Sequence, residues 1–127
     1  MMAMREALGE RIELTAEEVA EDTEATACVI LCDYVSEEDA GEMSEMLYKH
    51  VFMLVHDALM RRFSARHVRF RKDELAREVS EQVAEEMGMI VSIYLSDFTS
   101  IDEAIEGGAK IKGDVRIAVH DAIMRNF

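Results

Sequence analysis

The chain repeats one phrase after a shift of 64 positions. Residues 55–63, VHDALMRRF, align with residues 119–127, VHDAIMRNF, and the match continues upstream without a gap. An internal repeat restricts the architecture, because a unit that cannot bury its apolar face alone packs against its copy. A length of 127 residues is typical of one domain. We therefore expect a single domain, 1–127, made of pseudo-repeats 1–63 and 65–127 with an approximate twofold relation.

The repeating unit has the pattern of α-helices. Apolar residues recur at steps of three and four along most of the chain, and no proline interrupts them. Three four-residue sequences have the character of helix starts: Thr15-Ala-Glu-Glu18, Ser36-Glu-Glu-Asp39 and Ser100-Ile-Asp-Glu103. The last two are 64 positions apart, which supports the repeat independently. The sequence thus predicts an all-α protein, a helical bundle of five or six helices with short loops.

Helix boundaries follow from the caps and breakers. The expected elements are helices over about 15–35, 36–63 and 73–94, a loop at 64–72, a helix opened by Ser100, and a final helix from about Asp114. Within the loop, residues 67–71 alternate like a strand but lack a partner, so they are expected to be irregular or weakly extended. Gly107 and Gly108 are expected to break the second copy, because glycine weakens a helix interior.

A cluster of six basic residues interrupts an otherwise acidic chain with a net charge of −13. This basic belt consists of Arg61, Arg62, Arg66, Arg69, Arg71 and Lys72. One interpretation is that it pairs with the chain's own acidic helices or with an acidic protein partner, and the other is that it binds nucleic acid. An acidic body repels phosphates, which favours the first interpretation. We expect a protein partner and no nucleic acid.

The histidines and cysteines are the remaining candidates for chemistry. In His56-Asp57 and His120-Asp121, adjacent helical positions point about 100° apart, so no His–Asp dyad is expected within one copy. The expected arrangement is a solvated Asp and a His packed near the Met four residues on. A twofold axis bringing the two histidines together as a metal or pH-sensitive pair stays open as the alternative.

Cys28 and Cys32 lie four positions apart, and zinc would need two further ligands, whereas their counterparts are Ser92 and Ser96. We expect both cysteines to be small, buried residues that permit close packing between helices. No Glu-x-x-His precedes any histidine, and no phosphate-binding or nucleophile motif occurs. We expect no cofactor and name no catalytic or metal residue, with a small metal-dependent enzyme as the least favoured class.

Compartment and assembly follow from the apolar pattern. The longest apolar runs, 27–32 and 51–55, are far shorter than the roughly 20 residues that span a bilayer. Residues 1–6 lack the apolar stretch of a secretory signal, so a cytoplasmic protein without membrane insertion is expected. Long helices with apolar residues on several faces predict a homodimer.

Two resemblances add to this. With the phrase CVILCDY at 28–34 in a short, acidic, helical chain, the protein resembles DUF1959, a family of methanogenic archaea associated with a membrane-bound energy-converting hydrogenase. That resemblance implies an accessory, non-catalytic subunit and an intertwined helical dimer. The phrase AKIKGDVRIA at 109–118 is similar to the last loop and helix of a histone fold, which implies a histone doublet. The leading expectation is an interaction or accessory subunit, and the alternative is a histone-like nucleic-acid binder using the basic belt.

Overall fold

The computed structural model describes residues 2–64 and 71–127, with side chains from residue 7 onward. Its elements, in chain order, are α1 (Met2–Leu31), α2 (Glu37–Ser64), α3 (Lys72–Ser96) and α4 (Ile101–Asn126). The all-α bundle predicted from the sequence is confirmed. The predicted number of helices, five or six, was wrong, because the described residues form four long helices.

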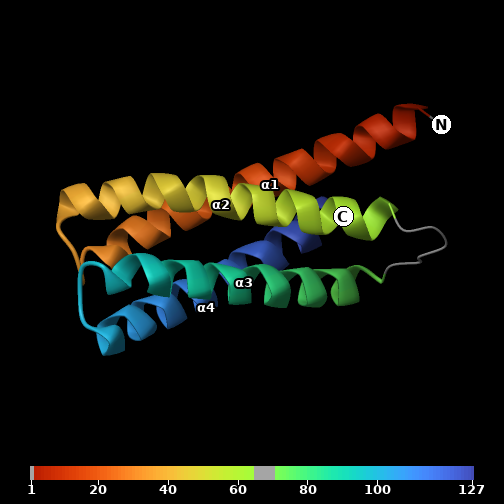
Figure 1. Cartoon of the computed structure of the whole chain (residues 1–127). Coiled ribbons are helices and arrows are strands. Elements are labelled where there is room, and N and C mark those ends of the chain that lie inside the picture. Colours follow the sequence, from red (N-terminus) through yellow and green to blue (C-terminus); the bar gives the residue numbers. More distant parts are fainter. Residues whose placement is uncertain (1, 65–70) are drawn as a thin grey trace.

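The four helices form two antiparallel hairpins, α1–α2 and α3–α4. The turns of both hairpins lie at one end of the bundle, while the end of α2, the start of α3 and the C-terminus lie at the other (Figure 1). Between the hairpins, α1 packs against α4 and α2 packs against α3. The result is an up-down-up-down bundle around one apolar core.

The turns of the two hairpins have the same hydrogen bonds. Ser36 Oγ accepts from the Asp39 amide at 3.1 Å, and Ser100 Oγ accepts from the Glu103 amide at 3.2 Å. These caps begin α2 and α4, as the sequence predicted. The preceding helices also end alike, since the amides of residues 35 and 99 donate to the carbonyls of residues 31 and 95 at 2.9 and 3.0 Å.

Core positions also correspond under the 64-residue shift. The buried pairs include Leu47 with Ile111, Val51 with Val115, Val55 with Val119 and Leu59 with Ile123, each at most 1% exposed. The Met60 and Met124 side chains are 44% and 37% exposed, and the half-buried rings of Phe63 and Phe127 stack at 5.3 Å. The twofold axis itself stays a prediction.

Two expected helix starts were misplaced. Thr15 does not cap α1 but lies inside it, and its Oγ1 donates to the Arg11 carbonyl at 2.7 Å. The segment before Thr15 is rich in Ala, Glu, Leu, Met and Arg, which favour helix, so α1 begins already at Met2. Asp73 is likewise inside α3, whose N-cap is Arg71 without a side-chain cap. Of the expected loop at 64–72, residues 65–70 lie outside the described residues.

The predicted break at Gly107 and Gly108 is wrong, because α4 runs through both without interruption. These glycines permit close contact between helices. A Cβ on Gly108 would lie 2.7 Å from the Gly88 carbonyl oxygen of α3, and one on Gly107 would lie 2.5 Å from Leu95 Cδ1. The histone-like phrase at 109–118 is consequently helical throughout.

Candidate functional site

The structure places the described part of the basic belt at the end of the bundle where α2 joins α3. Arg61 and Arg62 belong to the last turn of α2, and Arg71 and Lys72 lie at the start of α3. Arg66 and Arg69 lie outside the described residues.

Three arginines of the belt contact groups on this chain. Arg62 Nη1 pairs with Glu78 Oε2, which links α2 to α3. Arg71 lies 3.7 Å from an Asp73 carboxylate oxygen and 4.0 Å from one of Glu74. Arg61 Nε donates to the backbone carbonyl of residue 57 at 3.4 Å. Arg62 and Arg71 thus contact acidic side chains of α3, and exposed pairs of this kind contribute little stability.

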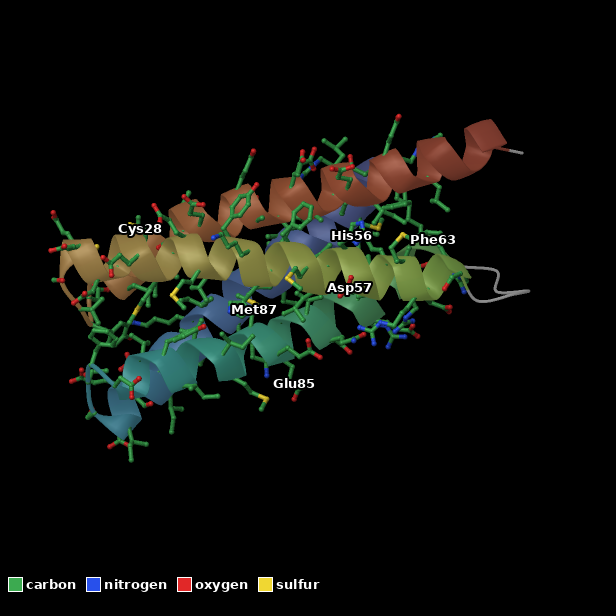
Figure 2. The ribbon with its side chains drawn as sticks, turned by 45° about the horizontal axis from the view of Figure 1, so that its top comes forward. Cys28, His56, Asp57, Phe63, Glu85 and Met87 are labelled. Carbon is green, nitrogen blue, oxygen red and sulfur yellow. The ribbon has the colours of Figure 1, made fainter. Side chains whose placement is uncertain are left out.

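Each His–Asp pair has a ring nitrogen near a carboxylate oxygen of the neighbouring residue. His56 Nδ1 lies 3.7 Å from Asp57 Oδ1, and His120 Nδ1 lies 3.5 Å from Asp121 Oδ1. Neither pair is hydrogen-bonded at these distances, so the absence of a His–Asp dyad within one copy stays a prediction. The His56 ring stacks at 6.0 Å on Phe52, one turn earlier, and Figure 2 labels His56 and Asp57 on α2. Among the described residues, no group of three or more His, Cys, Asp or Glu could hold a metal ion.

The two cysteines differ in environment. Cys28 is half-buried against the core, whereas Cys32 is exposed, and both are free thiols. Burial of both was expected, and it fails at Cys32 because α1 ends at Leu31 and the chain turns away there. Partial desolvation raises the pKa of the Cys32 thiol, and the neighbouring Cys28 and Glu37 raise it further. This thiol is a weaker nucleophile at neutral pH than an ordinary cysteine.

Each hairpin carries a groove along its outer face, and the linings correspond under the 64-residue shift. The α1–α2 groove, of about 370 Å³, is lined by Glu21, Glu24, Ala25, Cys28, Gly41, Ser44 and Glu45. The α3–α4 groove, of about 450 Å³, is lined by Glu85, Gly88, Met89, Ser92, Ile93, Gly108, Ala109 and Lys112. The first groove is therefore acidic, with three glutamates, and the second is mostly apolar.

The second hairpin carries five exposed, large apolar residues, two of which line its groove. We call this set the apolar strip: Met89, Ile93, Phe98, Ile101 and Ile105, which are 63, 65, 53, 73 and 58% exposed. Met89 and Ile93 are one turn apart on α3, as are Ile101 and Ile105 on α4, so each pair lies on one helix face. The strip was missed from the sequence, although comparison of the halves could have found it, since its counterparts are Ala25, Val29, Tyr34, Glu37 and Gly41.

No protein-family model, curated protein or solved structure matches the chain. The two resemblances drawn from its sequence phrases therefore remain hypotheses. Within residues 2–64 and 71–127, none of the helices is both long and apolar enough to span a membrane.

Proposed function

We propose that this protein is a non-catalytic interaction subunit whose apolar strip accepts an amphipathic helix from a partner protein. The observation that carries the proposal is the strip itself. Its five large side chains are more than half exposed, and two of them, Met89 and Ile93, line the groove between α3 and α4. Helix-in-groove binding uses such a surface, with the apolar face of the partner helix laid along it.

The charge around the strip specifies the partner. Exposed carboxylates occur on both helices of the strip, among them Glu85, Glu86 and Asp102, and they outnumber Lys112, the one cationic residue that lines the groove. In Figure 2 the Glu85 side chain points away from the bundle. An acidic rim favours a partner helix with Lys or Arg beside its apolar face, and it opposes a second copy of a chain whose net charge is −13.

A designed peptide tests this directly. The probe is a labelled helical peptide with leucines on one face and lysines beside them, and its control has glutamates in place of the lysines. We expect saturable binding of the lysine peptide by fluorescence anisotropy and none of the glutamate peptide. Ile93→Asp should weaken binding roughly tenfold or more, the scale of a central interface residue. Val29→Asp is the matched control.

Val29 is the counterpart of Ile93 and is 73% exposed, so the same substitution there changes charge equally without touching the strip. Equal loss of binding in the two variants would reject the strip as the binding surface. The homodimer expected from the sequence is the competing occupant. If light scattering gives the mass of a dimer and Ile93→Asp dissociates it, the strip binds a second copy of this chain and not a partner helix.

The contacts of the described part of the basic belt favour no second function. Arg61, Arg62 and Arg71 already contact acceptors on this chain, and phosphate binding would have to displace those contacts. We accordingly predict no appreciable DNA or RNA binding at physiological salt. Nanomolar, salt-sensitive retention in a gel shift, lost when Arg66, Arg69 and Arg71 become Ala, would contradict this and favour the histone-like alternative.

A further inference from the structure

Met89 is the one residue of the apolar strip whose side chain a mild oxidant converts from apolar to polar. Its thioether side chain is 63% exposed and lines the α3–α4 groove together with Gly88 and Ile93. A peroxide oxidises an accessible methionine to the sulfoxide, which is polar, whereas the thioether packs as an apolar group. The other four side chains of the strip are hydrocarbons, which peroxides leave intact.

Exposure selects Met89 over its neighbour on the same helix. Met87, labelled in Figure 2, is 0% exposed, so an oxidant dissolved in water does not reach its sulfur. Two helical positions turn a side chain by about 200°, which places Met87 in the core and Met89 at the surface. Ala25 takes the place of Met89 in the α1–α2 groove, so the thioether distinguishes the two grooves.

We propose that Met89 is an oxidation site that controls the strip, because the thioether form binds the partner helix and the sulfoxide form releases it. This inference rests on the function proposed above. The sulfur lone pair attacks the terminal oxygen of a peroxide, the O–O bond breaks, and the proton of that oxygen passes to the departing alkoxide or hydroxide. The sulfur gains the oxygen and gives up two electrons, which reduce the peroxide to an alcohol or water. A methionine sulfoxide reductase restores the thioether.

Binding of the partner helix buries the place where the new oxygen stands. A helix laid along the strip covers Met89 with its apolar face, which has no hydrogen-bond donor for a sulfoxide oxygen. The oxygen therefore loses its bonds to water on binding, and an unpaired buried polar group is unfavourable. We expect the sulfoxide to weaken binding about tenfold, the scale of one unpaired polar group.

Fluorescence anisotropy with the lysine peptide tests the switch on the full chain. The protein is treated with hydrogen peroxide, the excess is removed, and mass spectrometry of its fragments locates the added oxygen. We expect oxidation at Met89, none at Met87, and peptide binding about tenfold weaker than in the untreated chain. Reductases for both sulfoxide epimers should restore the affinity, and circular dichroism should show that the oxidised chain stays folded.

The matched comparison is Met89→Leu against Met53→Leu. Met53 is 60% exposed on α2, so peroxide reaches it equally, but it does not belong to the strip. Peptide binding by Met89→Leu should survive peroxide, whereas binding by Met53→Leu should fall as in the unsubstituted chain. Both variants keep Cys28 and Cys32, so oxidation of the thiols affects them alike. Equal losses in the two variants would overturn the site.

A polar side chain and a protection experiment test the same site without relying on peroxide damage. Met89→Gln places an amide in the strip and should weaken binding about tenfold in the untreated protein. Saturating lysine peptide should slow the oxidation of Met89 and leave that of Met53 unchanged. Full affinity after complete oxidation of Met89 would overturn the switch. Failure of the untreated chain to bind the peptide would instead reject the proposed function, and the switch with it.

Discussion

The two hairpins have equivalent turns but different outer grooves, and the difference is set by a few side chains. The α1–α2 groove is lined by Glu24 and Ser44, whose counterparts in the α3–α4 groove are Gly88 and Gly108. The glycines permit backbone contact, since the space of a Gly108 Cβ is already occupied by α3. The same helical period thus yields an acidic groove of about 370 Å³ in the first hairpin and a mostly apolar groove of about 450 Å³ in the second.

The two seams between the hairpins, α1–α4 and α2–α3, also differ in how completely side chains fill them. At the α2–α3 seam the large Met87 fills the interior, while at the α1–α4 seam Thr23 leaves a cavity of about 220 Å³. Positions 64 residues apart therefore differ in two places, in the grooves of the two hairpins and in the two seams between them. Substitutions that exchange counterpart residues test whether those side chains account for the difference.

The largest expected effect comes from opening the filled seam. Met87→Thr removes a fully buried side chain and leaves a hydroxyl in its place, so the free energy of unfolding should fall by about 3 kcal/mol, within the range for large-to-small core changes. Urea denaturation followed by circular dichroism measures it. A loss below about 1 kcal/mol would mean that Met87 is not what closes the α2–α3 seam.

A smaller loss of stability should follow from a substitution that pushes α3 and α4 apart. Gly108→Ala places a Cβ 2.7 Å from the Gly88 carbonyl oxygen, and such overpacking costs about 2 kcal/mol. The control is Ser44→Ala at the counterpart position, which loses only the hydrogen bond to the Ala40 carbonyl. Thermal melting of both variants should rank Gly108→Ala as the less stable. A reversed order would contradict the account of close packing.

The turns, in contrast, should respond alike. Ser36→Ala and Ser100→Ala each remove one N-cap hydrogen bond of similar length, so each should lower stability by about 1 kcal/mol. Chemical denaturation of the two variants in parallel is the measurement. A clear difference between them would show that the hairpins differ at their turns as well as along their grooves.

The smallest effect concerns the thiol that the second half lacks. The raised pKa of Cys32 leaves less thiolate at a given pH, so alkylation by iodoacetamide should be slower than for free cysteine near pH 8 and should rise with pH over a higher range. Cys28→Ser isolates the site and removes one of the causes. Alkylation as fast as that of free cysteine would contradict the raised pKa.

What could be predicted from the sequence is what depends on local chemistry. The helical period identified the all-α class, and Ser36 and Ser100 identified two helix starts, because an N-cap bond joins residues three apart. Local rules also misled. Thr15 has the pattern of a cap, yet inside a helix the same hydroxyl can bond one turn back, and continuous good helix formers before it decide for that alternative.

Only the tertiary structure decided the role of residues whose neighbours lie on another helix. Gly107 and Gly108 would weaken an isolated helix, but across from Gly88 and Leu95 they are what allows α4 to pack on α3. The α1–α4 cavity likewise depends on residues far apart in the chain, because α1 lines it with Asp22 and Thr23 and α4 lines it with Asp114 and Ala118. Period and caps determine where helices run, whereas grooves and cavities depend on pairs of side chains that the chain brings together only when it folds.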